Sequence, residues 1–104
     1  MTQGERASQI WQVLVGAACN RQVLTYTLVG DRIGMGAGTL AGPLGLIMKY
    51  CEHHGLPPLT VLVVNKETGV PGEGLTTLEE PNRDRERVFA HDWYKLVPPS
   101  FDQP

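Results

Sequence analysis

Several features are scarce in this chain of 104 residues, and each shortage excludes a class of protein. No apolar run reaches the roughly 18 residues that a membrane-spanning helix needs, so no membrane partner is expected. Two cysteines, Cys19 and Cys51, are too few for a disulfide framework. The first residues, Met1–Ser8, are polar and lack the apolar core of a signal peptide. The expected location is therefore the cytoplasm.

Residues that carry catalysis are also scarce. Ser8 and Ser100, near the two ends of the chain, are the only serines, which leaves little for a Ser-His-Asp arrangement. No two carboxylates have the setting of a general acid and base. The glycine-rich stretch Gly34–Gly38 follows no Val- and Ile-rich strand, so it does not predict a nucleotide site. The sequence predicts a protein that is not an enzyme and has no small-molecule cofactor.

Cys51 and His54 are spaced one helical turn apart, with His53 adjacent, and two ligands at that spacing can begin a metal site. Further ligands would have to come from His91, Cys19 or a carboxylate, and the spacing matches no zinc pattern. A core cysteine beside histidines that favour the end of a helix is the simpler interpretation. We therefore expect no metal.

The length suggests one domain, and the charge balance suggests that it does not bind phosphate groups strongly. Nine basic and eleven acidic residues give a net charge of −2, whereas non-specific DNA binding needs clustered Lys and Arg. A local basic face remains compatible with this balance. The length fits a single domain over residues 1–96, and residues 97–104 form a Pro-rich tail that should be extended and partly disordered.

The first half of the chain reads as helices separated by tight turns. Apolar residues at helical spacing predict a helix over Ala7–Asn20. A brief extended piece at Val23–Tyr26 precedes a short helix at Leu28–Ile33, which Thr25 or Thr27 can cap and Gly34 ends. The next helix is expected at Leu40–His54, with Thr39 as its N-cap and Gly55 closing it.

The second half predicts a strand, a turn and a last helix. Leu59–Val64 is a continuous β-branched and apolar run, typical of a buried strand. Asn65–Gly69 is turn-like, a second short strand can follow, and Asn82 can cap a helix over Arg83–Tyr94. The predicted fold is α+β: a small winged-helix-like domain made of a helix-turn-helix, a short β-hairpin and a C-terminal helix.

Five segments together resemble a known family. Ile10–Leu14 is similar to its V-W-x-x-L helix, Thr25–Val29 to its S/T-Y-x-x-L-A element, and Thr39–Gly42 stands where the family has R-A-V-G. Leu56–Gly69 resembles its N-P-x-x-x-P-C-H-R-V-V-x-x-x-G passage, and Glu73–Leu75 its later G-G-L. In this order the segments resemble the winged-helix DNA-binding domain of the alkylguanine-DNA alkyltransferases and alkyltransferase-like proteins.

Two departures limit what the resemblance implies. The family's nucleophilic Cys has no counterpart, because Leu59–Val64 contains no Cys, His or Arg, and alkyl transfer needs an activated thiolate. Thr39 stands where the family has the Arg that enters the duplex. The resemblance therefore implies a non-catalytic module that binds double-stranded DNA weakly, in DNA repair or regulation.

The predicted DNA contacts follow from hydroxyls, helix ends and basic residues in such a fold. They are Thr25, Tyr26, Thr39, Lys49, Lys66 at the expected wing tip, Arg83 and Arg87. All of these except Lys49 have a structural alternative: capping and packing for the first three, a polar turn around Lys66, and a solvated helix face where Asp84 and Glu86 interleave with the arginines.

The alternative function is a small acidic protein-binding module, such as an immunity protein, an antitoxin or an adaptor. The acidic balance favours it, and so does a recognition helix on which Glu52 offsets the single basic residue Lys49. Trp93 and Tyr94, beside the Pro-rich tail, are residue types common at protein interfaces. Packing of the last helix on the first is the structural alternative for these two residues.

Overall fold

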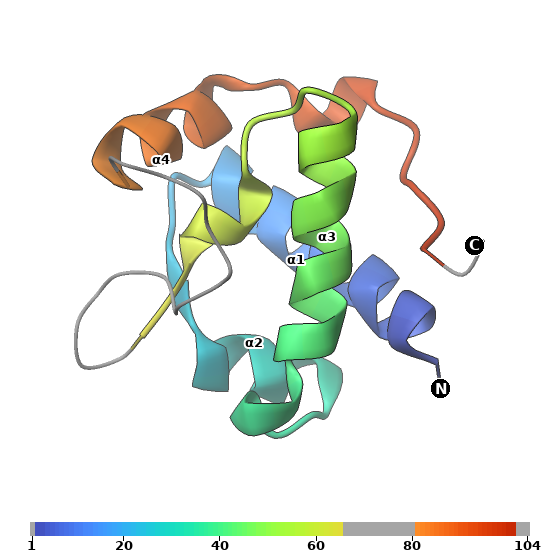
Figure 1. Ribbon diagram of the computed structural model, residues 1–104. Helices are drawn as coiled ribbons and strands as arrows, with labels where there is room; N and C mark the ends of the chain where they lie inside the picture. Colours follow the sequence, from blue (N-terminus) through green and yellow to red (C-terminus); the bar gives the residue numbers. More distant parts are fainter. Residues whose placement is uncertain (1, 66–80, 102–104) are drawn as a thin grey trace.

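The structure is a computed structural model that describes residues 2–65 and 81–101. Figure 1 shows an α-rich α+β domain in which helices surround a very short sheet. Among the described residues there are four α-helices and two strands: α1 (Gln3–Cys19), β1 (Leu24–Thr25), α2 (Tyr26–Ile33), α3 (Ala41–His53), β2 (Val63–Val64) and α4 (Pro81–Ala90).

Helix α1 begins four residues before the predicted start at Ala7 because Thr2 caps it. The Thr2 hydroxyl accepts a hydrogen bond from the Glu5 backbone N–H at 3.0 Å, and the Glu5 carboxylate accepts one from the Thr2 N–H at 3.2 Å. This reciprocal capping box satisfies two N–H groups that have no partner within the helix. The Thr-x-x-Glu spacing was the sequence signal for the true start.

Helix α2 confirms two local predictions. The Thr25 hydroxyl accepts from the Leu28 N–H at 3.1 Å, so Thr25 rather than Thr27 is the N-cap. The helix starts at Tyr26, two residues before the predicted Leu28. Gly34 ends it in the left-handed region at φ 75°, which glycine adopts without steric cost. The turn then packs closely on the helix at Gly30, where any side chain would collide with the Met35 carbonyl.

The prediction that Thr39 caps the next helix is wrong. Residues Ala37–Thr39 form a 3₁₀ turn, and the Thr39 hydroxyl donates to the Gly36 carbonyl at 2.7 Å. Helix α3 starts two residues later, at Ala41, with Leu40 in the N-cap position. The Leu40 side chain is fully buried, so packing rather than a capping hydrogen bond determines where α3 begins.

The predicted strand over Leu59–Val64 is wrong for most of its length. Leu59–Leu62 form a 3₁₀ helix, η2, which a hydrogen bond from the Val61 N–H to the Pro58 carbonyl at 3.0 Å helps to close. Only Val63–Val64 are extended, and they pair in parallel with β1, Leu24 opposite Val63. The predicted burial holds across the run. An apolar run does not by itself distinguish a strand from a buried helical turn.

The predicted hairpin cannot be followed along the chain. Beyond Asn65, the expected wing turn Asn65–Gly69 and the second short strand lie outside the described residues. The one pairing of β2 within residues 2–65 and 81–101 is the parallel one with β1. The described sheet therefore ties α2 to η2 rather than forming a wing.

The last helix starts earlier and ends earlier than the predicted Arg83–Tyr94. Helix α4 begins at Pro81, a residue suited to a first helical position, so Asn82 lies inside the helix rather than capping it. After Ala90 the chain turns into a 3₁₀ helix, η3 (Trp93–Lys95). The Trp93 indole N–H donates to the Val88 carbonyl at 2.8 Å, which fixes this turn against α4.

The core lies where α1 packs against α3, η2 and α2. Its fully buried side chains come from all four segments and from α4: Ile10, Leu14, Val29, Leu44, Ile47, Leu59, Leu62 and Val88. Within the described part of the chain, no helix is both long and apolar enough to cross a bilayer.

The Pro-rich segment from Val97 onward folds back toward the helices. It runs down beside α3, as the red trace in Figure 1 shows, and Phe101 packs against the domain. The Phe101 ring centroid lies 5.5 Å from that of Tyr50 and 6.0 Å from that of Trp11. Part of the predicted tail therefore contributes to the packing of the domain.

Candidate functional site

The exposed surface of α3 changes character along its length. Near its amino end the outer residues are small: Ala41 is exposed, and a Cβ added at Gly45 would meet no atom within 4 Å. Near its carboxyl end the outer residues are larger and polar, with Lys49 and His53 exposed. The helix thus offers two candidate binding surfaces.

The three predicted contacts at the amino end are largely engaged in local structure. The Thr25 and Thr39 hydroxyls make the capping and turn hydrogen bonds described above. Tyr26 is half-buried and packs against the core. Both threonines still lie close to the surface, Thr39 exposed and Thr25 half-buried, at the end of the molecule where α2 and α3 begin.

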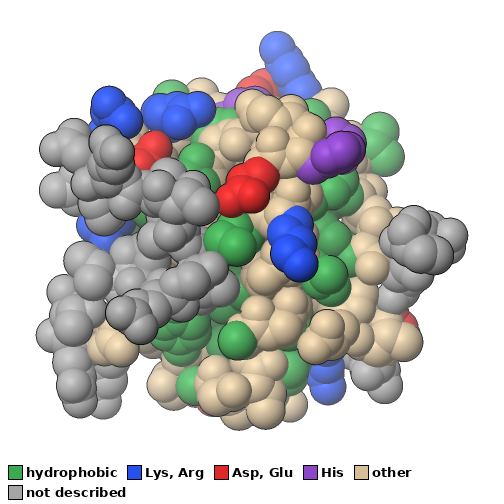
Figure 2. Space-filling view, viewed as in Figure 1, with side chains coloured by type: hydrophobic (Ala, Val, Ile, Leu, Met, Phe, Trp, Pro, Cys, Tyr) green, Lys and Arg blue, Asp and Glu red, His purple; other side chains and the backbone are tan. Residues whose placement is uncertain are grey.

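The predicted basic contacts do not gather on one surface with these threonines. Arg83 and Arg87 belong to α4, at the top left of Figure 1, whereas α2 and the start of α3 lie at the bottom. Arg87 pairs with the buried Asp84 at 3.4 Å. In Figure 2 the basic side chains are scattered and interspersed with acidic ones. Lys66 lies outside the described residues, so the predicted interface is only partly assembled.

Arg21 shows what the charges around α4 do. It sits at φ 54° in the turn after α1, its guanidinium bonds both carboxylate oxygens of Glu86 at 2.7 and 3.0 Å, and it lies 4.8 Å from the Phe89 ring centroid. These contacts fasten α4 to the turn between α1 and β1. The Arg21–Glu86 ion pair therefore joins two elements of the fold.

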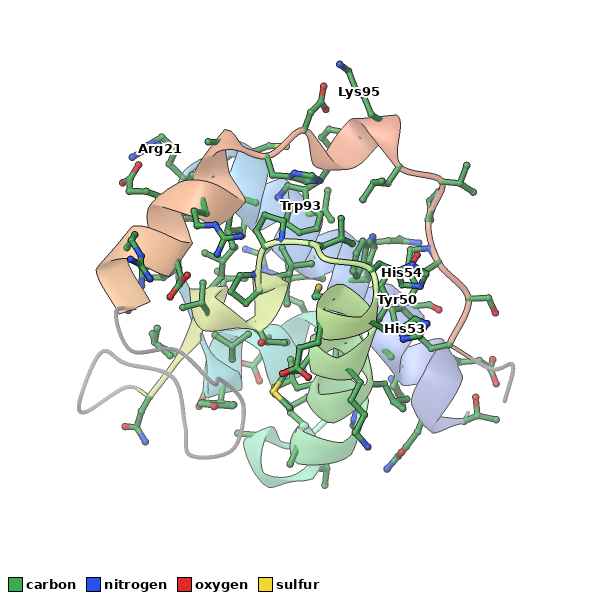
Figure 3. All side chains as sticks on the ribbon, turned by 45° about the horizontal axis from the view of Figure 1, so that its top comes forward. Arg21, Tyr50, His53, His54, Trp93 and Lys95 are labelled. Carbon is green, nitrogen blue, oxygen red and sulfur yellow. The ribbon has the colours of Figure 1, made fainter. Side chains whose placement is uncertain are left out.

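An aromatic cluster that the sequence analysis did not predict lies at the carboxyl half of α3. The Trp11 ring is 5.6 Å from both Tyr50 and Trp93, edge to face in each case. Tyr50 in turn lies 4.2 Å from the His54 ring, as the labelled side chains in Figure 3 show. Trp93 therefore packs on the first helix, as the structural alternative for it proposed, although from η3 rather than from α4.

Beside this cluster, α3 and the end of the C-terminal segment enclose an open groove of about 740 Å³, here called the α3 groove. Its principal lining residues are Leu46, Lys49, Tyr50, His53, His54 and Phe101. The first five recur at a spacing of three or four residues along α3 and its C-cap, which the sequence could have revealed. Phe101 is 47 or more residues away in sequence, and no local pattern connects it to them.

The α3 groove carries one cation, Lys49, and one carboxylate, Glu52, among its described lining residues. Lys49, His53 and His54 are exposed on the groove, and Glu52 is the one carboxylate among its described lining residues. Within residues 2–65 and 81–101, Lys49 has no ion-pair partner, unlike Arg21, Arg87 and Lys95. A ligand carboxylate or phosphate would therefore not have to displace an existing partner of Lys49.

The two cysteines have contrasting surroundings. Burial raises the pKa of the Cys51 thiol to about 11, with a smaller rise from Glu52, against a lowering by the Leu59 backbone N–H. The exposed Cys19 lies against Tyr94, and charge repulsion from Cys19 raises the pKa of that phenol. Among the described residues, no group of three His, Cys, Asp or Glu is placed to hold a metal ion, so Cys51 and His54 are not joined by further ligands.

No protein-family model, curated protein or solved structure matches this chain. The function must therefore be argued from the site itself, because the same fold supports many functions.

Proposed function

We propose that the chain is a non-catalytic DNA-binding module of winged-helix architecture that binds double-stranded DNA weakly through α2 and the amino end of α3. The observation that carries the proposal is that α2 and α3 follow one another through one turn, as the two helices of a helix-turn-helix do (Figure 1), with Ala41 exposed at the start of α3. In helix-turn-helix proteins the second helix of the pair lies in a groove and its amino end meets the DNA.

The amino end of α3 suits a phosphate for a second reason. Leu40, at the N-cap position, has no side-chain oxygen, so no cap from it occupies the N–H groups of Ala41 and Gly42; Pro43 has no N–H, and the Leu44 N–H donates to the Leu40 carbonyl at 3.0 Å. These N–H groups and the helix dipole together attract anions. The small side chains of Ala41 and Gly45 allow the DNA backbone to approach closely.

The charge pattern predicts that the affinity is low. Lys49 is the one basic residue among the outward residues of α3 before His53, and Glu52 lies one turn further on. Each phosphate neutralised by a protein cation contributes about 0.9 to the slope of log K against log salt. A module with so few cations should bind in the micromolar range or more weakly, with a shallow salt dependence.

Fluorescence anisotropy with labelled DNA of about 20 base pairs, at ~50 and ~200 mM salt, tests the proposal. The informative variant is Ala41→Glu, because a carboxylate in a first helical turn favours the helix but repels phosphate. The matched control is Gln22→Glu, which adds the same charge in the turn that Arg21 ties to α4. We expect Ala41→Glu to weaken binding about tenfold and Gln22→Glu to change it less than about twofold.

Two outcomes contradict the proposal. Equal weakening by both variants would mean that DNA senses only the net charge, and a wild-type chain that leaves the anisotropy unchanged at high protein concentration would exclude DNA binding. Circular dichroism of each variant checks that the helices are intact.

A second candidate is the protein-binding module, and exposed apolar side chains favour it. Tyr94 is 72% exposed and Val97, three residues further along the chain, is 87% exposed. A photoreactive residue placed at Val97 should then cross-link to a discrete protein in cells that express the chain. The same residue at the exposed polar position Gln22 should not, and indistinguishable adducts at the two positions would exclude a partner at Val97.

A further inference from the structure

We infer that the α3 groove binds an extended peptide segment of another protein in which an aromatic side chain is followed by an acidic residue. This goes beyond the DNA-binding proposal, because it concerns the carboxyl half of α3 and a different class of ligand. Three observations carry it: the aromatic wall of the groove, the segment that already lies against that wall, and Lys49, a cation that forms no ion pair with the described carboxylates.

The wall of the groove is built to contact another ring. Tyr50 is held in place by Trp11 at 5.6 Å, with the two rings at 83°, and by His54 at 4.2 Å. Trp11 is only 4% exposed, so the ring that supports Tyr50 is anchored in the core. Aromatic pairs in such edge-to-face geometry are stabilising beyond their buried area, and a held ring loses little freedom on binding.

The C-terminal segment of the chain itself shows what this surface accepts. It leaves η3, passes through Pro98 and Pro99 without forming a helix, and lays Phe101 on Tyr50 at 5.5 Å with an interplanar angle of 68°. An extended segment carrying an aromatic ring therefore already packs at one side of the groove. The remaining volume, between Phe101 and the Leu46–His53 face of α3, is open to a second such segment.

Charge complementarity adds the acidic residue. Lys49 lines the groove with no ion-pair partner among the described residues. His53 and His54, labelled in Figure 3, line the same groove. A ligand carboxylate next to Lys49 would form an ion pair that Lys49 does not make with any described residue. In the sequence the chain itself has this chemistry, since Asp102 directly follows Phe101.

A nucleic acid fits the groove less well. A strand of phosphates needs several cations along its path, whereas Lys49 is the one Lys or Arg in the described lining and Glu52 would repel the next phosphate. A peptide needs one cation and an aromatic contact, and the groove supplies both.

The test uses ¹⁵N-labelled full-length chain and a synthetic peptide, Val-Pro-Pro-Ser-Phe-Asp, with both ends blocked. We expect saturable amide shifts confined to α3 from Leu46 onward and to Ser100 and Phe101, with a Kd below about 1 mM. The peptide with Asn in place of Asp should bind at least about threefold more weakly, and the peptide with Ala in place of Phe should not saturate.

Charge reversal locates the ion pair. Lys49→Glu should weaken binding of the Asp peptide at least about threefold, and the Asp and Asn peptides should then bind with equal affinity. Lys95→Glu is the matched control, because Lys95 is an exposed cation on η3 that already pairs with Asp92 at 3.9 Å. Lys95→Glu should leave the affinities of both peptides unchanged.

The outcomes separate this inference from the DNA-binding proposal. Ala41→Glu should leave peptide binding intact even though it weakens DNA binding. The DNA-binding proposal and the peptide-binding inference can therefore fail independently. The inference is overturned if the peptide causes no shifts up to about 2 mM, or if the Asn peptide binds as well as the Asp peptide. A single-stranded hexanucleotide that shifts the groove residues where the peptide does not would also overturn it.

Discussion

The two halves of α3 share one buried stripe but present different surfaces. Leu44 and Ile47 are fully buried on the same side and hold the whole helix against α1. On the outer side, the amino half carries the small residues Ala41 and Gly45, where the backbone is accessible. The carboxyl half carries Lys49 and the anchored Tyr50 ring. One helix thus separates a surface defined by backbone groups from a surface defined by side chains.

The difference extends to what holds each half in place. The amino half depends on backbone geometry: the left-handed Gly34, the 3₁₀ turn at Ala37–Thr39 and the close approach of Gly30 to Met35. The carboxyl half depends on rings contributed by distant parts of the chain, Trp11 and Phe101. Substitutions should therefore affect the two halves by different mechanisms and with different magnitudes.

The largest effect is expected for Trp11→Ala. Its ring is buried and contacts Tyr50, Trp93 and Phe101, so truncation leaves a large cavity and should lower the free energy of unfolding by about 3–5 kcal/mol. Urea denaturation followed by circular dichroism measures it. Trp11→Phe, which keeps a ring, is the control and should cost less. A loss under about 1 kcal/mol would show that the cluster does not support the carboxyl half.

The second prediction concerns the stability of the carboxyl half at high pH. Burial raises the pKa of Cys51 from its ordinary value of 9.0 to about 11. Because the folded-state pKa is the higher one, this stabilisation is complete below pH 9 and is lost as the pH rises through 11. From about pH 8 to about pH 10.5, wild type should lose about 2 kcal/mol more than Cys51→Ala does.

The comparison with Cys51→Ala removes the contribution of other groups that titrate in this range. The free energy of unfolding of both proteins is measured at each pH by urea denaturation. If the free energies of unfolding of the two proteins fell in parallel with pH, ionisation of the Cys51 thiol would not affect stability.

The same contrast explains how much could be predicted from the sequence. The Thr25 cap and the end of α2 at Gly34 were predicted correctly because they depend on residues within one turn of each other. Thr39 was misassigned because the burial of Leu40 set the helix start, and burial is not local. The 3₁₀ helix at Leu59–Leu62 was read as a strand because an apolar run fits either form.

The candidate sites divide in the same way. Lys49 was predicted as a contact and lies on the α3 groove, whereas the contribution of Phe101 could not be predicted, because it packs on Tyr50 from across about half the chain. Arg87 was predicted from its spacing to Arg83, but its pairing with the buried Asp84 follows from how α4 packs.

The smallest effects should have opposite signs at two glycines that flank the same surface. Neither Gly34 nor Gly45 would bring an added Cβ within 4 Å of another atom, so only the backbone decides the outcome. At Gly34, φ is 75°, and Ala there should cost about 1 kcal/mol of stability. Gly45 lies inside α3, so Ala there should add about 0.5–1 kcal/mol by reducing the freedom of the unfolded chain.

Thermal denaturation of the two variants measures this difference, and the double variant should lie near wild type because the sites are independent. If Gly45→Ala were destabilising, the amino half of α3 would be held by a contact to the glycine backbone that a methyl group disturbs. If Gly34→Ala were neutral, the turn would have relaxed to a negative φ, and the angle between α2 and α3 would have changed with it. DNA binding by Gly34→Ala then separates the two cases, because only a changed angle would alter how the start of α3 meets a duplex.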